Sequence, residues 1–282
     1  MQYGINLLLW TDTLHDGLLP LLDKLKAMGY DTVELPLFEL DVDKCAAWGK
    51  RLDDAGLART ACTVRGADDN PISSDPAVRA AGVANNKLAV ECAAAAGCPV
   101  MIGPYHSGLG VFTGSGPTAD EWKWGVEGMQ AVAEHAAAHN VQLGLEYLNR
   151  FECYLLNCAA DGAKFVAEVN HPNCGMMYDT FHAHIEEKDV AAAIRALRGC
   201  LKHVHISEND RSTPGKGGVN WKANFDSLHE IGYDGLMVVE AFGTALEGLA
   251  AATKIWRRMF DTEEQLAADA LAFMKQEVGA RR

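Results

Sequence analysis

Three features are scarce or missing in this 282-residue sequence, and each absence excludes a class of protein. No apolar run approaches the roughly 20 residues that span a bilayer, so we expect no transmembrane helix. Lys and Arg number 25 against 38 Asp and Glu, which gives a net charge of −13. This balance disfavours nucleic acid as a partner, because clustered basic side chains hold phosphate backbones. No basic amphipathic helix indicates a membrane surface as a partner either.

The eight cysteines are scattered along the chain and form no C-x-x-C pair. Disulfide frameworks are typical of short secreted domains, so we expect reduced and mostly buried thiols in a chain of this length. The N-terminus shows no charged leader, no long apolar segment and no small-residue cleavage site. Together these patterns predict a cytoplasmic protein.

Short apolar segments alternate with longer helical segments along the whole chain. Several predicted helices end in glycine, as at Gly29 and Gly56, because glycine adopts the left-handed conformation that closes a helix. Strands that alternate with helices at this spacing predict parallel βαβ units. The predicted strands are Tyr3–Trp10, Thr32–Leu35, Ala58–Val64, Pro99–Gly103, Gln142–Glu146, Cys174–Tyr178, Leu201–Ile206 and Leu236–Glu240.

The count of eight strands favours a closed barrel. A doubly wound open sheet has the same rhythm, but no G-x-G-x-x-G motif follows the first strand. A β/α barrel needs roughly 250 residues, and no linker or change in composition marks a second domain. We therefore predict an α/β fold in which residues 1–282 form a single (β/α)8 TIM barrel, with a C-terminal helical extension at Thr262–Gly279.

Four potential metal ligands, Glu146, Asp179, His205 and Glu240, lie at the ends of the last four predicted strands. The carboxyl ends of the strands form the active-site face of such a barrel. Side-chain alternation makes each of the four the topmost inward-facing residue of its strand. Three close carboxylates would repel one another without a cation, and this oxygen-rich set suits Mn²⁺ or Mg²⁺, with Co²⁺ as a substitute. The alternative to a metal site is that these four are unrelated polar residues that cap the ends of their strands.

Four segments give the sequence a family resemblance: LEYLNRFE at 145–152, DTFH at 179–182, HVHISE at 203–208 and VEAF at 239–242. They resemble the ketose 3-epimerases, the D-tagatose, D-allulose (psicose) and L-ribulose 3-epimerase group of the xylose isomerase-like barrels. The resemblance extends over nearly the whole chain, including VELPL at 33–37 and IWR at 255–257. It departs from the family pattern at Ala183-His184 and at the Leu7–Leu9 run, which leaves the preferred ketose open.

The resemblance implies one divalent ion per subunit, Mn²⁺ first with Co²⁺ or Mg²⁺ as alternatives, bound by the four strand-end residues. It also implies that Glu146 and Glu240 invert C3 of a free ketose by deprotonation and reprotonation through a cis-enediolate. The sugar would be D-tagatose, D-fructose or D-allulose, or L-ribulose, in a homodimer or homotetramer. The residues that the resemblance assigns to holding the sugar are Glu152, His182 and Arg211.

Other functions remain as alternatives. A related metal-dependent isomerase or dehydratase, of the hydroxypyruvate isomerase or inosose dehydratase kind, would share the metal but differ in the sugar-holding residues. A sugar-binding protein without catalysis would not be expected to keep both glutamates, and the acidic charge disfavours a nuclease on this fold.

For several further residues the sequence predicts a position in the fold but no part in the chemistry. Segment 214–218 is expected to be a loop leading into a helix capped at Asn220, not a phosphate cradle, because it lacks the Walker spacing. His203 is expected to be a packed, hydrogen-bonded histidine inside the barrel, one layer below His205. The alternative is that it supports the metal ligands from behind, and Glu34, at the end of its strand, is a candidate for the same role. Trp10 and His106 are candidates for lining the sugar pocket, and the apolar face of Ala245–Phe260 is expected to be core.

Overall fold

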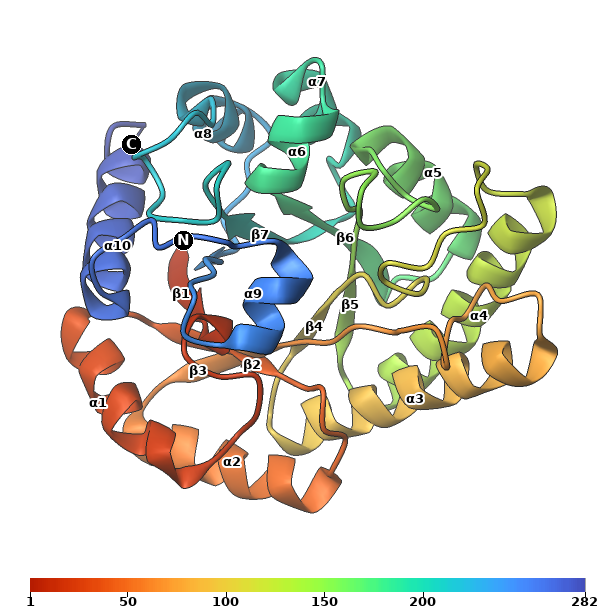
Figure 1. Ribbon diagram of the computed structural model, residues 1–282, viewed down its shortest axis with the longest axis horizontal. Coiled ribbons are helices and arrows are strands. Elements are labelled where there is room, and N and C mark those ends of the chain that lie inside the picture. Colours follow the sequence, from red (N-terminus) through yellow and green to blue (C-terminus); the bar gives the residue numbers. More distant parts are fainter. Residues whose placement is uncertain (282) are drawn as a thin grey trace.

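A computed structural model describes residues 1–281, in which eight parallel strands close into a barrel in chain order (Figure 1). Each strand pairs with the next, and β1 pairs with β8, so the sheet has no free edge. The predicted TIM barrel is confirmed. Its strands are β1 (Gln2–Asn6), β2 (Thr32–Pro36), β3 (Ala58–Cys62), β4 (Val100–Gly103), β5 (Gln142–Glu146), β6 (Cys174–Asp179), β7 (Leu201–Ile206) and β8 (Leu236–Val239).

The helices surround the strands, and their ends follow local rules. Thr118 and Glu121 form a reciprocal capping box at the start of α4, and α1 ends where Gly29 adopts a left-handed φ of 96°. The last helix, α10, packs against β1 and β8 and completes the outer ring (Figure 1). The α-helices are α1 (Leu19–Met28), α2 (Val42–Ala55), α3 (Pro76–Ala95), α4 (Ala119–Ala138), α5 (Ala159–Val169), α6 (Thr180–Glu186), α7 (Val190–Ala196), α8 (Trp221–Glu230), α9 (Glu247–Thr253) and α10 (Glu263–Gly279).

Apolar side chains pack in two separate regions. The larger region lies between the strands and the helices and includes Ile5, Leu143 and Phe165, all fully buried. The smaller cluster includes Ile102 of β4 and Met177 of β6. Burial of each such side chain contributes about 1.5–3 kcal/mol. Three further members of this cluster, Leu8, Cys62 and Phe242, also line the cavity described below, so the cluster forms part of the apolar wall of that cavity.

The first strand is shorter than the sequence predicted. It ends at Asn6 rather than Trp10, and Leu7–Leu9 form a 3-10 helix instead. The cause is local, because the Asn6 side chain accepts a hydrogen bond from the Leu8 N–H and turns the chain out of the sheet. β3 likewise ends at Cys62, two residues before the predicted end.

The cysteine expectation is confirmed, since all eight thiols are free and six of them are buried. Within residues 1–281, no helix combines the length and the apolar character that crossing a membrane requires.

Candidate metal and sugar site

The four predicted ligands converge at the carboxyl ends of the strands. Glu146 and Asp179 are the last residues of β5 and β6, His205 is the penultimate residue of β7, and Glu240 follows β8 directly. All four side chains are buried, and one donor atom from each lies within 4.8 Å of the others. The β6–β7 register pairs Asp179 with His205, as their shared inward parity requires.

The imidazole of His205 presents one nitrogen to this cluster. Its Nε2 lies 2.6 Å from Oε1 of Glu34, and its Nδ1 lies 3.4 Å from Oε1 of Glu240 and 3.7 Å from Oδ2 of Asp179. Because the Glu34 carboxylate accepts the Nε2 proton, Nδ1 of the neutral ring directs a lone pair at the carboxylates. Within residues 1–281, Nδ1 makes no hydrogen bond. A buried imidazole nitrogen that makes no hydrogen bond and lies beside carboxylate oxygens is a suitable ligand for a divalent cation.

The shifts of the pKa values in this cluster indicate an excess of negative charge. Burial, with Glu240 and Asp179, raises the pKa of Glu146 well above its usual range. Burial alone would lower the pKa of His205, but Glu240 and Glu34 outweigh it and raise that pKa. A proton on His205 and a metal ion would therefore occupy the same position at Nδ1.

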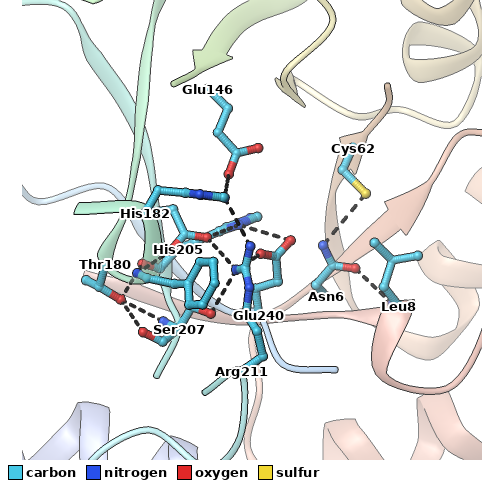
Figure 2. A network of polar contacts seen from close by, with 12 residues as sticks. Asn6, Leu8, Cys62, Glu146, Thr180, His182, His205, Ser207, Arg211 and Glu240 are labelled. Atoms are coloured by element: carbon cyan, nitrogen blue, oxygen red, sulfur yellow. Dashed lines mark hydrogen bonds and ion pairs between the residues drawn. The ribbon is translucent and has the colours of Figure 1, made fainter. Parts of the chain in front are cut away.

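Arg211 supplies the positive charge that reaches into this cluster. Its Nη1 donates to Oδ2 of Asp179 at 3.0 Å and to Oε2 of Glu240 at 2.6 Å. Its guanidinium carbon lies 3.7 Å from the ring centroid of Phe181, and the side chain is only 5% exposed. Burial acts to raise the pKa of Asp179, but Arg211 and His205 outweigh it, and the pKa is lowered. Figure 2 shows Arg211 and Glu240 in contact, with His205 beside them.

The loop that carries Arg211 is organised around Glu208, which is fully buried. The Glu208 carboxylate accepts hydrogen bonds from Gly215 N at 2.9 Å, Val219 N at 3.0 Å and Trp221 Nε1 at 2.9 Å. The Arg211 N–H donates to the Glu208 carbonyl at 2.9 Å, and Arg211 adopts a left-handed φ of 61°. Such a conformation is uncommon outside glycine, so the contacts around Glu208 hold a strained backbone that directs Arg211 inward.

The prediction for the glycine-containing segment at 214–218 is confirmed. Its Gly215 amide is bonded inside the loop to Glu208, and the side chain of Asn220 accepts from Ala223 N at the start of α8. The segment is therefore a lead-in to a helix.

His182 and Glu152 are linked through Asn149. The Asn149 N–H donates to Nδ1 of His182 at 3.0 Å, and the Asn149 amide nitrogen donates to Oε1 of Glu152 at 2.8 Å. Burial and the nearby Arg211 lower the pKa of His182 to about 4, so the ring is neutral. Nδ1 of the ring accepts from Asn149, and Nε2 lies 3.0 Å from Nη2 of Arg211 and 3.5 Å from Oε1 of Glu146 (Figure 2).

A cavity of about 540 Å³ opens above these residues. Its polar lining includes all of the predicted catalytic and sugar-holding residues, which are Glu146, Glu240, Glu152, His182 and Arg211. Its apolar lining comes largely from loops and α9, and apart from the Leu7–Leu9 run it was not predicted from the sequence. These apolar residues include Leu8, Phe38, Leu109, Phe242 and Leu249.

Two expectations for the cavity wall were wrong. Segment 245–260 is core only in part, because Leu249 and Ala252 of α9 face the cavity while Ala250 is buried. Neither Trp10 nor His106 is among the residues that line it. His106 is fully buried, with its Nε2 2.7 Å from the backbone oxygen of Glu146. Periodicity cannot separate an apolar residue that faces a cavity from one that faces the core.

The fold and the site define a class of protein: a closed β/α barrel with a buried Glu-Asp-His-Glu cluster beneath a cavity at its carboxyl face. The family model described as "Xylose isomerase-like TIM barrel" matches residues 22–277. A Mesorhizobium japonicum L-ribulose 3-epimerase is 34% identical over 277 residues, covering 97% of this chain and 93% of the relative.

Two solved structures have similar folds. An L-ribulose 3-epimerase superposes with a TM-score of 0.93 at 33% identity, covering 100% of this chain and 96% of the other. A D-allulose 3-epimerase from Methylomonas sp., in complex with D-allulose, has a TM-score of 0.92 at 29% identity, covering 98% of this chain and 97% of the other. The chain belongs to the ketose 3-epimerase family of the xylose isomerase-like barrels.

Proposed function

We propose that this protein is a metal-dependent enzyme that inverts C3 of free ketoses, with Glu146 and Glu240 as the proton-transfer pair. The observation that carries the proposal is that both carboxylates belong to the metal-type cluster and also line the cavity. One comes from β5 and the other from the end of β8, which are separated in the barrel by β6 and β7. Two bases that approach from different strands suit inversion, because the proton must leave one face of the carbon and return to the other.

The residues have distinct tasks in this proposal. When bound by Glu146, Asp179, His205 and Glu240, a divalent ion acts as a Lewis acid that stabilises negative charge developing on the ketose oxygens. One glutamate removes the C3 proton, and the other returns a proton from the opposite face.

Three further residues hold the sugar. Arg211 is a donor that orients sugar oxygens, the imidazole of His182 forms a hydrogen bond to a sugar hydroxyl, and Glu152 is an acceptor for a sugar hydroxyl. The similarity to a structure solved with D-allulose supports a ketose in this cavity.

The finer assignments extend this proposal. We assign Mn²⁺ as the ion, with Co²⁺ or Mg²⁺ as substitutes, and D-tagatose, D-fructose, D-allulose and L-ribulose as the ketoses to test first. The assembly is a homodimer or homotetramer in the cytoplasm. The alternative is a related metal-dependent isomerase or dehydratase, and the pairing of Glu152 with Arg211 around one cavity favours the epimerase.

Isotope exchange tests the reaction directly. The Mn²⁺-loaded protein is incubated in D₂O with each ketose, and NMR locates the deuterium. Deuterium at C3 together with a new epimer is the expected result. Deuterium at C1 with aldose formation would assign the protein to the isomerases, and no exchange with any of the four ketoses would overturn the proposal.

A matched pair of variants tests the assignment of Glu240. Glu240→Gln should abolish C3 exchange, because the amide cannot accept the proton. Glu247→Gln, which changes an exposed glutamate at the start of α9, should retain activity. Full activity in Glu240→Gln would exclude this residue as a base.

A further inference from the structure

A second group of metal-binding side chains lies on the outer helices, apart from the cavity. Glu91 comes from α3, and His135 and His139 come from the end of α4. The two histidines are four residues apart, so they lie on the same face of the helix, one turn from each other. All three side chains are partly exposed and can therefore bind an ion from solution.

The three side chains are already close together. Nε2 of His135 lies 3.0 Å from Oε1 of Glu91, and the ring centroids of His135 and His139 are 4.6 Å apart. One donor atom from each residue lies within 4.8 Å of the others. An ion would replace the hydrogen bond between Glu91 and His135 with two coordinate bonds and would recruit His139 as the third ligand.

This donor set differs in kind from the one in the barrel. Two imidazoles and one carboxylate suit a borderline ion such as Zn²⁺, which takes three protein ligands and completes a tetrahedron with water. We propose that Glu91, His135 and His139 form a second metal site, specific for Zn²⁺ and similar transition-metal ions. The site is separate from the catalytic centre and does not depend on the reaction assigned to that centre.

The position of the cluster in the fold indicates what the ion does. His139 is three residues before the start of β5, whereas Glu146 is the last residue of that strand. The cluster therefore lies at the amino ends of the strands, opposite the cavity. Since Glu91 and the histidines belong to neighbouring outer helices, a bound ion joins α3 to α4 and stabilises the folded chain without touching the sugar site.

Metal counting in the loaded protein tests the proposal. The Mn²⁺-loaded protein is dialysed against Zn²⁺, and all bound metal is counted per chain. The wild-type protein should hold two ions in total, whether or not Zn²⁺ also displaces Mn²⁺ in the barrel. The His135→Ala, His139→Ala double variant should hold one. Glu91→Gln should weaken the outer site at least about tenfold, since even residues that only orient a ligand change metal affinity by about 10- to 100-fold.

Controls separate a lost site from a damaged fold. His229→Ala removes an exposed histidine of α8 that is outside the cluster, and it should retain two ions. Zn²⁺ should raise the melting temperature of the wild-type protein and of His229→Ala more than that of the double variant. One ion per chain in the wild-type protein, or two in the double variant, would overturn the proposal.

Discussion

The carboxylate of Glu34 lies 2.6 Å from Nε2 of His205 and 3.0 Å from Nε2 of His203, so one fully buried glutamate spans two successive inward-facing histidines of β7. Thr60 Oγ1 and Asn6 Nδ2 donate to the same carboxylate at 2.8 and 3.0 Å. Burial acts to raise the pKa of Glu34, but the two histidines outweigh it and the pKa is lowered. A charged Glu34 therefore fixes the orientation and the tautomer of His205, as expected of a residue behind a metal ligand.

Glu34→Gln should weaken divalent-metal binding by about 10- to 100-fold, because the amide cannot reliably hold the ring proton on Nε2. Metal affinity measured by titration calorimetry checks this. Glu39→Gln, which changes an exposed glutamate just beyond β2, should retain wild-type affinity. Equal affinities for the two variants would show that Glu34 does not orient the ligand.

Glu208→Gln should separate sugar handling from metal binding. The amide offers one acceptor oxygen where the carboxylate offers two, so buried donors of the Arg211 loop lose their partner, at about 1–3 kcal/mol each. We expect a lower kcat/KM for the ketose and a lower melting temperature, with metal affinity close to wild type. Glu230→Gln, on the exposed part of α8, is the control. Unchanged kcat/KM would mean that the loop holds Arg211 without Glu208.

Removal of the proposed ion should destabilise the protein, because the positive charge of Arg211 and of a protonated His205 would then have to offset three buried carboxylates. At a free-ion concentration of about 100 Kd, ligand binding contributes about 2.7 kcal/mol. For a chain of this size that corresponds to a melting temperature lower by roughly 5 °C after chelation. The experiment uses the His135→Ala, His139→Ala variant, so that only the barrel site responds. No change on chelation, or no recovery with Mn²⁺, would contradict a metal site at these residues.

The barrel and the convergence of Glu146, Asp179, His205 and Glu240 could be predicted because both depend on short-range rules. A strand alternates its side chains with a period of two, so parity alone placed Glu146 and Asp179 on the inward side. The cavity wall could not be predicted in this way. Phe38 lies in a loop and Leu249 in a short helix, and their apolar character is the same as that of core residues. The end of β1 depended on one hydrogen bond that the Asn6 side chain accepts from the Leu8 N–H, and hydrophobic periodicity does not report such a bond.

Gly103 links the stability of the barrel to the shape of the site. It ends β4, lines the cavity and has a φ of 129°, a conformation that side-chain-bearing residues rarely adopt. A Cβ at this position would lie 2.2 Å from the carbonyl oxygen of Thr63, so the backbone of β4 or of the Thr63 loop would have to move. The close approach therefore requires glycine.

Gly103→Ala should lower the free energy of unfolding by about 3 kcal/mol or more, because backbone strain of about 1–3 kcal/mol adds to the steric clash. Gly116→Ala is the matched control, since a Cβ there meets open space and φ is not positive, and its effect should stay within about 0.5 kcal/mol. Urea unfolding of both variants measures the difference. The strand end would shift beside Glu146, so Gly103→Ala should also reduce ketose turnover. Two variants of equal stability would show that β4 accommodates the methyl group without strain.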